Sequence, residues 1–357
     1  MSDKELRKAL LQSNYNRSDS KLEFLQDGVV LSNHPLFAID GNTLGLILYS
    51  DEIERCNAVG TRVKKHKLLL FYYLVSNLPK KYCSVLDAIN LFAVVKSEDI
   101  AIYGFDIILE PFLNDLKQHS MPDGYPINLK DGETICMRAS LVAYVADNPT
   151  AHKAIGLKES VGGALRKCRF CNADNNAMQN GFREEDFEAQ TLKKHLEQCS
   201  VISGATQTLE DHYRTSHGIN RKSILTDFPH FDMFKQTPPD VMHVLLEGVP
   251  PLTLQALIKH YIDTKVTNLA TINSVIQSIP YSYMEITDKP NYICEKDLHG
   301  STTLNQDAAK CCLLFRIFLF VVGDSINFSD SHWELYILLS DITEICFASV
   351  VSLETIA

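Results

Sequence analysis

Residues 134–147 read TICMRASLVAYVAD, an apolar run rich in β-forming residues that ends in an aspartate. Asn148 and Pro149 follow as a break, and the residues from Thr150 onward are typical of a helix. This stretch therefore predicts a strand that runs directly into a helix, with Asp147 at the junction.

Two other apolar runs predict further buried strands. LGLILY, residues 44–49, leads to Asp51, and KLLLFYYLV occupies residues 67–75. The polar segment ERCNAVGTR between them is of the kind that joins antiparallel neighbours. Residues 86–95, LDAINLFAVV, fit either a strand or a helix, whereas residues 106–118 show the apolar spacing of a helix.

The rest of the chain has a helical texture. Residues 1–25 are polar and helix-like, and residues 162–327 are mostly helical with scattered loops. Within the latter range, residues 311–322 predict a strongly apolar, buried helix, and residues 329–350 predict one more packed helix. The sequence then stops at Ala357 without a polar tail, which suggests a missing continuation.

Bulk composition excludes several classes of protein. A chain of 357 residues that is 45% hydrophobic and 22% charged is globular, with room for one large or two ordinary domains. The N-terminus has no apolar signal segment, and the most hydrophobic stretch is short and contains Arg316, so no membrane role is expected. Ten cysteines without an export signal indicate a reducing compartment rather than a disulfide framework.

The net charge of -10 argues against a surface that binds nucleic acid over its whole extent, although it leaves room for a local basic groove. Basic residues cluster downstream of each of two acidic candidates, and the ordinary interpretation of such runs is a solvated face. The first cluster is Arg62, Lys64, Lys65, His66 and Lys67, and the second is Lys153, Lys158, Arg166, Lys167 and Arg169.

Asp51 and Asp147 are the first candidates for chemistry, because each ends a predicted buried strand. If these strands are parallel neighbours, the two carboxylates meet at one edge of the sheet. Paired carboxylates hold the hard divalent ions of a two-metal phosphoryl-transfer site. The alternative is that each aspartate merely begins a turn.

Two short pairs of metal-ligand type form a second candidate site. Cys168 and Cys171 form a CxxC pair, and Asp240 and His243 form a DxxH pair, so together they could complete a tetrahedral zinc site. His195 and Cys199, in HLEQC, are a competing second pair that is closer in sequence. Two ordinary buried thiols are the remaining alternative.

Several stretches resemble the transposases of the CACTA (En/Spm) type and their uncharacterised animal relatives. The most specific is PPDVMHVLLEGVPPLTLQALI, residues 238–258, preceded by HYRTSHGINRKSIL and KCRFC. LILYSDEIERCN, KKHKLLLFYYLVSNLP, YGFDIILEPFLNDL and LVAYVADNPTAHKAIG extend the resemblance, in order, over roughly residues 20–350.

This resemblance implies an α/β, RNase H-like mixed sheet with a long helical insertion. The first and second acids then fall on Asp51 and Asp147, and the CxxC and DxxH pairs on the positions named above. A third acid is expected on a helix well after the second, where Glu344 is our choice over Asp341, Glu334 and Glu354, or over an ordinary surface glutamate. The implied domains are an N-terminal helical segment at 1–25, the first part of the core at 26–161, the insertion with the zinc region at 162–327, and a truncated helix that returns to the core at 328–357.

The implied activity is cleavage and joining of DNA strands by two Mg²⁺ or Mn²⁺ ions, with structural Zn²⁺ at the cysteines. The expected partner is DNA at transposon ends, the expected compartment is the nucleus, and a homo-oligomer is possible. Two rival hypotheses are a non-catalytic, zinc-stabilised nuclear interaction protein derived from a transposase, and an unrelated metal-dependent nuclease. Because the net charge is negative and the chain stops early, it could also be an inactive fragment.

Overall fold

The structure, a computed structural model, describes residues 20–23, 25–39, 42–54, 67–79, 82, 85–129, 132–159, 164–299, 304–327 and 329–356. Its contacts divide the chain into two compact units, Met1–Pro239 and Asp240–Ala357. The predicted insertion at 162–327 contributes residues to both units. Most of the predicted N-terminal helical segment, and the basic residues 62–66, lie outside the described residues.

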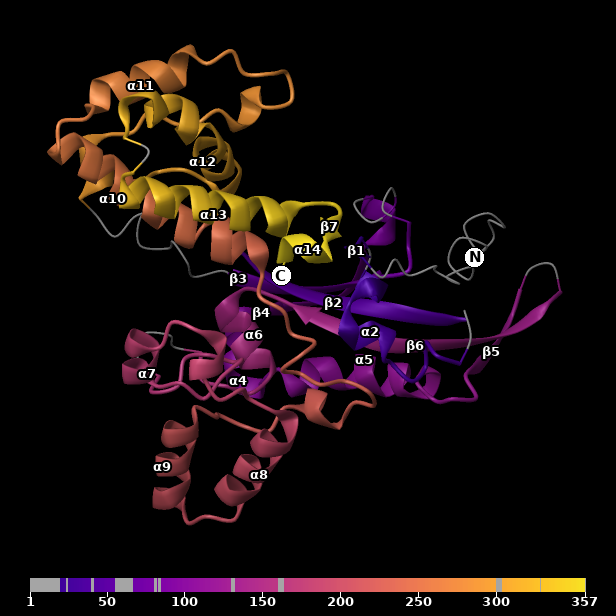
Figure 1. The fold of residues 1–357 in the computed structure, drawn as a ribbon. Helices are drawn as coiled ribbons and strands as arrows, with labels where there is room; N and C mark the ends of the chain where they lie inside the picture. Colours follow the sequence, from indigo (N-terminus) through magenta and orange to yellow (C-terminus); the bar gives the residue numbers. More distant parts are fainter. Residues whose placement is uncertain are drawn as a thin grey trace. The chain divides into compact units, whose positions relative to one another are not determined.

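A five-stranded mixed sheet forms the centre of the first unit (Figure 1). The strand order is β4-β3-β2-β6-β5, in which β2 pairs parallel with β6 and every other neighbouring pair is antiparallel. The predicted strands and their antiparallel pairing are thus confirmed, and the ambiguous residues 86–95 form a short 3-10 turn followed by a strand. The strands are β2 (Thr43–Glu54), β3 (Lys67–Val75), β4 (Asn90–Lys96), β5 (Tyr125–Asn128) and β6 (Thr134–Val145).

Helix α5 (Asp106–His119) connects the antiparallel strands to β6 and lies along the sheet, as Figure 1 shows. Its residues Leu109, Leu113 and Leu116 are buried and share one hydrophobic core with Leu48 and Leu141 of the two parallel strands. The spacing of these leucines by four and three positions puts them on one helix face. The helix predicted at residues 106–118 is therefore confirmed.

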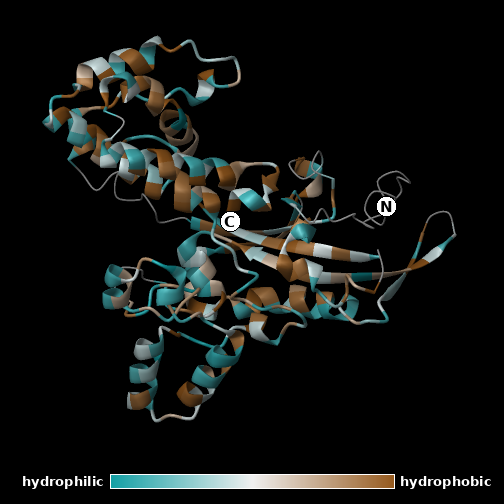
Figure 2. Cartoon of the chain, in the orientation of Figure 1, coloured by the Kyte–Doolittle hydropathy of each residue, from teal (hydrophilic) through white to brown (hydrophobic). Residues whose placement is uncertain are grey.

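The other helical elements of the first unit are shorter and more polar, and Figure 2 shows largely hydrophilic colouring on α7 and α9. They are η1 (Leu25–Asp27), α2 (Val29–Ser32), η2 (Leu86–Ala88), α4 (Ser97–Tyr103), α6 (Asn148–Ala154), α7 (Asn175–Asn180), η3 (Glu184–Asp186), α8 (Leu192–Ser203), α9 (Gln207–His217) and η4 (Ile224–Asp227). A short strand, β1 (Lys21–Leu22), also belongs to this part of the chain.

The second unit is helical and has its own core, centred on α12, the apolar helix that the sequence predicted. Leu314 and Phe318 of α12 pack with Leu254, Ile272 and Tyr336 of three other helices. Among the described residues, no helix combines the length and the apolar character that a membrane span requires. The elements are η5 (Met242–Leu246), α10 (Val249–Asp263), α11 (Leu269–Ser278), η6 (Ile286–Asp288), η7 (Glu295–Leu298), α12 (Ala308–Val322), η8 (Gly323–Ser325), α13 (Ser331–Phe347), β7 (Val351–Ser352) and α14 (Leu353–Ile356).

Candidate functional site

Asp51 and Asp147 lie near the ends of two neighbouring parallel strands, although neither is the last residue of its strand as predicted: Asp51 is inside β2, and Asp147 follows the end of β6. The last paired residues of β2 and β6 are Tyr49 and Val145. Continued by two positions, this register sets Asp51 beside Asp147, and both residues are half-buried. Since alternate residues of a strand point to the same face, Asp51 shares the face of Tyr49. Asp147 lies beyond the end of β6, so its approach to Asp51 stays a prediction. Neighbouring strands are about 4.8 Å apart, so the backbone geometry suits two carboxylates that share cations.

A buried hydrogen bond ties the same two strand ends together on the opposite face. The Oγ of Ser50 and the hydroxyl of Tyr144 are 2.6 Å apart, and both residues are buried. Burial raises the pKa of Tyr144 far above its ordinary value, so the phenol stays protonated. This bond holds the strand ends in register directly before the two aspartates.

Asp147 is also the N-cap of α6. Its Oδ1 accepts the backbone N–H of Thr150 at 2.8 Å, and Pro149 occupies the first turn of the helix. The alternative interpretation, in which Asp147 merely begins a turn, therefore describes the local structural role of this residue. The cap fixes the orientation of the carboxylate, which a metal ligand also requires.

A lysine lies close to this acidic edge. Lys67 forms an ion pair with Glu52, and Ser97 donates a hydrogen bond of 2.7 Å to the same carboxylate. The pKa of Lys67 is raised chiefly by the bond to Glu52, with a further contribution from the charge of Asp147. A fixed positive charge is thus already within electrostatic reach of Asp147.

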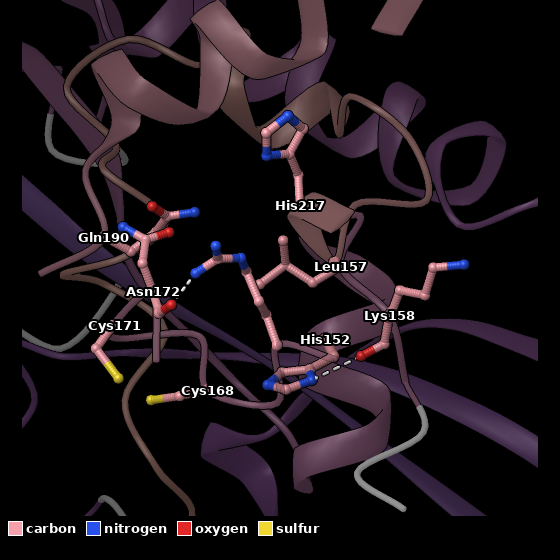
Figure 3. Close-up of a pocket in the computed structure, with 10 residues that line it drawn as sticks. His152, Leu157, Lys158, Cys168, Cys171, Asn172, Gln190 and His217 are labelled. Carbon is pink, nitrogen blue, oxygen red and sulfur yellow. Dashed lines mark hydrogen bonds between the residues drawn. The ribbon is translucent and has the colours of Figure 1, made fainter. Parts of the chain in front are cut away.

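The CxxC pair forms a loop at a small cavity (Figure 3). Figure 3 shows the sulfurs of Cys168 and Cys171 close together on one side of this cavity. Cys168 Sγ accepts the backbone N–H of Phe170 at 3.3 Å, and Cys171 Sγ accepts that of Ala173. Burial raises the pKa of the Cys171 thiol. Two thiols, each with an N–H donor two residues later, present the sulfur geometry of a metal-binding knuckle.

Arg169, between the two cysteines, is an internal connector and not part of an exposed basic patch. Its guanidinium donates to the carbonyl oxygens of Thr237 and Pro238 at 3.1 and 3.0 Å, and to Asn148 Oδ1 at 2.7 Å. The residue is only 2% exposed, so these bonds replace its hydration. Arg169 therefore fixes the CxxC loop to the first residue of α6, next to Asp147.

Two histidines also line the cysteine cavity. His152 Nδ1 is 3.0 Å from the carbonyl oxygen of Lys158, and burial lowers the pKa of this histidine. His217 lies on another side of the cavity, well away from the sulfurs in Figure 3. In the described part of the chain, neither imidazole joins the two sulfurs in a group of three ligand atoms within 4.8 Å of one another.

The competing pair, His195 and Cys199, does not line this cavity. Both residues are buried on α8, where His195 Nε2 and Cys199 Sγ are 3.4 Å apart and the imidazole contacts the ring of Phe234. Burial lowers the pKa of His195 to about 4, with a contribution from Lys222. This pair contributes a neutral histidine and a thiol to the core of the first unit.

Asp240 and His243 form a local pair at the start of the second unit. Asp240 Oδ2 lies 3.0 Å from His243 Nδ1, and Oδ1 accepts the backbone N–H of Met242 at 2.9 Å. Residues 242–246 form a single π-helical turn, which is often found at functional sites. The cysteines belong to the other unit, so a site shared by all four residues stays a prediction.

Glu344, the predicted third acid, lies on the exposed side of α13. The buried side of this helix carries Trp333, Tyr336 and Leu339 instead. Its alternatives Asp341, Glu334 and Glu354 are exposed as well. Since all four acids belong to the second unit and the aspartate pair to the first, their convergence also stays a prediction.

The sequence reasoning missed the residues that support the candidate site. Ser50 and Tyr144 carried no motif, and Arg169 was grouped with basic surface residues. A usable signal existed for Arg169, because an arginine inside CRFC that follows an apolar strand–helix unit is placed to satisfy loop carbonyls. His152 and His217 had no such signal, since the cavity joins segments that are distant in sequence.

Residues 101–251 match the Plavaka transposase family. The match covers less than half of the chain, and it includes Asp147 together with the CxxC and DxxH pairs, whereas Asp51 and Glu344 lie outside it. A search of curated proteins gave no match. The comparison supports a transposase-derived protein, and it names the Plavaka transposases and not the CACTA type.

Proposed function

We propose that this protein is a transposase-derived, RNase H-like protein that cleaves and joins DNA strands at Asp51 and Asp147. The observation that carries the proposal is the parallel pairing of β2 with β6, whose last pair, Tyr49 and Val145, lies two residues before each aspartate. The family match over residues 101–251 supports DNA as the partner. Action on transposon ends, in the nucleus, belongs to the same proposal.

The strand order supports an RNase H-like core. In such a sheet the first two acids end adjacent central strands. Here β2 is the middle strand of the five, two antiparallel strands lie on one side of it, and β6 lies beside it in parallel after a helical connection. The antiparallel edge strand β5 adds a hairpin to β6.

Two carboxylates at this edge suit Mg²⁺ or Mn²⁺, which bind oxygen ligands and, when bound as a pair, stabilise the attacking and leaving oxygens of phosphoryl transfer. The chain's own contribution is positioning. The α6 cap orients Asp147, the Ser50–Tyr144 bond fixes the strand ends, and Arg169 holds α6 against the CxxC loop. Glu344 is the proposed third acid.

Zn²⁺ at the cysteines is part of the proposal, because the donor set fits it. Zinc prefers thiolate and imidazole ligands, and the two cysteines of the CxxC loop supply two sulfur donors on one side of the cavity. Asp240 is already bonded to His243 Nδ1, which suits an orienting partner more than a ligand. We therefore keep Cys168, Cys171 and the DxxH pair as the proposed site, with His243 supplying the ligand atom.

Nicking and strand-transfer assays on labelled transposon-end DNA test the catalytic part. We expect Mg²⁺- or Mn²⁺-dependent products from the parent protein and a loss of at least about a hundredfold in Asp51→Asn and Asp147→Asn. Asp123→Asn, which changes an exposed loop aspartate, is the matched control and should retain activity. Cleavage that persists in both aspartate variants would exclude this site.

A non-catalytic, transposase-derived DNA-binding protein is the second candidate, and Lys67 favours it. The ammonium of Lys67 pairs with Glu52 and acts on Asp147, so it supplies a positive charge where a metal ion would otherwise be needed. Salt-dependent DNA binding without any metal-dependent nicking would support this candidate.

A further inference from the structure

A second cluster of metal-ligand residues lies in the helical unit. It consists of His260 in the last turn of α10, Asp330 at the N-cap of α13 and His332 in the first turn of α13. One ligand atom from each residue lies within 4.8 Å of the other two. No other described residues bring together three ligand atoms from histidine, cysteine, aspartate or glutamate in this way.

The two helices hold these side chains in place. Trp333 and Tyr336 anchor the first turns of α13 in the core of the unit, and Tyr261 anchors the end of α10 in the same core. Asp330 Oδ1 accepts the backbone N–H groups of His332 and Trp333 at 2.8 and 3.3 Å, which fixes its carboxylate. The three residues of the cluster thus lie on or directly before helices that pack against the core of the unit.

The two imidazole rings need a rotation before their nitrogen atoms can bind one cation. The imidazoles of His260 and His332 stack with centroids 3.9 Å apart and planes at 19°, and His332 Nδ1 is 3.3 Å from Asp330 Oδ1. Stacked rings point their lone pairs in parallel, so coordination requires a turn about the Cβ–Cγ bond, which is a soft torsion. His332 is exposed and His260 half-buried, so both have room for this turn.

A buried hydroxyl beside the cluster is a second, independent observation. Tyr261 is fully buried, and its hydroxyl has no hydrogen-bond partner among the described residues. The rings of His260 and Tyr261 contact each other edge to face, with centroids 5.3 Å apart, which places Tyr261 beside the cluster. An unsatisfied buried hydroxyl is destabilising, and a water molecule bound to a cation in the cluster would give it a partner.

We propose that His260, Asp330 and His332 bind a divalent transition-metal ion, with Zn²⁺ as the first candidate, and so clamp the end of α10 to the start of α13. Two imidazoles and one carboxylate are the donors that suit Zn²⁺, Ni²⁺ or Co²⁺ and not Mg²⁺ or Ca²⁺. Three protein ligands leave at least one position for water. The site is independent of the aspartate pair and of the CxxC loop.

Zinc titration of the full, chelator-treated chain tests the site by calorimetry, with metal stoichiometry as a second readout. We expect His260→Gln and His332→Gln each to abolish one binding event or to weaken it at least tenfold, because loss of even an outer partner of a ligand costs about 10–100-fold. Asp330→Asn retains a good N-cap but loses the charged ligand, so it should weaken binding without unfolding α13. His212→Gln, an exposed histidine of α9, is the matched control.

A Cys168→Ser/Cys171→Ser variant separates this site from the proposed zinc knuckle. The His–Asp binding event should persist in that variant, and it should lack the sulfur-to-metal absorption band when Co²⁺ replaces Zn²⁺. The proposal is overturned if the histidine variants bind zinc with the stoichiometry and affinity of the parent, or if all zinc binding disappears with the two cysteines.

Discussion

At the scale of single residues, a few buried polar groups decide how the candidate site is held. Arg169, Ser50 and Tyr144 are each almost completely buried, and each forms hydrogen bonds beside the strand ends that carry the aspartates. When one partner of a buried hydrogen bond is removed, the other stays buried without a partner and incurs the full desolvation penalty. Substitutions at these positions should therefore affect stability before they affect chemistry.

Arg169→Met should lower the free energy of unfolding by about 2–4 kcal/mol, because three acceptors lose a charged donor that only the side chain supplies. Urea unfolding followed by circular dichroism measures this. Arg183→Met is the control, since its contact with Glu185 is 4.0 Å long and the arginine side chain is 78% exposed. Equal effects of the two substitutions would show that Arg169 is not a connector.

His195 should make the first unit sensitive to acid. Its pKa is about 4 in the folded chain and 6.5 when unfolded, so below pH 6.5 the unfolded state binds a proton that the folded state does not. Stability contributed by the neutral ring is complete above pH 6.5 and is lost as the pH falls towards 4, by on the order of 3 kcal/mol.

Unfolding free energies measured from pH 7 to pH 4 check this expectation. His195→Met should reduce the slope of unfolding free energy against pH by the equivalent of nearly one bound proton. His212→Met, at an exposed position, should leave this slope unchanged. An unchanged slope in His195→Met would mean that this ring is not the group that titrates.

At the scale of secondary-structure elements, the most unusual feature is the π-helical turn at residues 242–246, which leads into α10 through Gly248. The N–H of Glu247 bonds to the carbonyl oxygen of Met242, which widens the turn. The backbone then passes so close that a Cβ on Gly248 would lie 2.3 Å from the carbonyl oxygen of Val244. Only glycine fits without a shift of the backbone.

Gly248→Ala should destabilise the second unit by about 1–3 kcal/mol, since an inserted methyl group forces backbone movement. Gly204→Ala is the matched control, because its Cβ would meet its nearest atom at 3.5 Å, an ordinary contact. Thermal unfolding of both variants measures the difference. A Gly248→Ala protein as stable as Gly204→Ala would show that this turn can relax.

At the scale of the whole molecule, the net charge and the division into two units have to be distinguished from the local ion pairs and the separate cores. The net charge is -10, and several basic side chains in the described part of the first unit form ion pairs, as with Arg221 and Asp106 at 2.6 Å and Lys222 and Asp227 at 2.7 Å. The two units each bury a core of their own. Composition alone could allow two domains but could not place the division at Pro239.

The sequence by itself determined the elements whose apolar pattern is strong. The strands at 44–49, 67–75 and 134–145, the helix at 106–118 and the apolar helix at 311–322 follow from local periodicity, because one face or both faces of each are buried in a core. It also singled out Asp51 and Asp147, since an acidic residue at the end of an apolar strand is visible in the chain itself.

Only the tertiary structure decided which of these residues become neighbours. The parallel pairing of β2 with β6, which ends two residues before Asp51 and Asp147, joins segments about 95 positions apart that no local pattern brings together. The same holds for Arg169, whose partners lie 21 to 69 positions away, and for His260 and His332, which two distant helices bring into stacking contact. For Arg169 the physical reason is burial, because a buried polar group requires hydrogen-bond partners, and these come from whichever segments the fold places beside it.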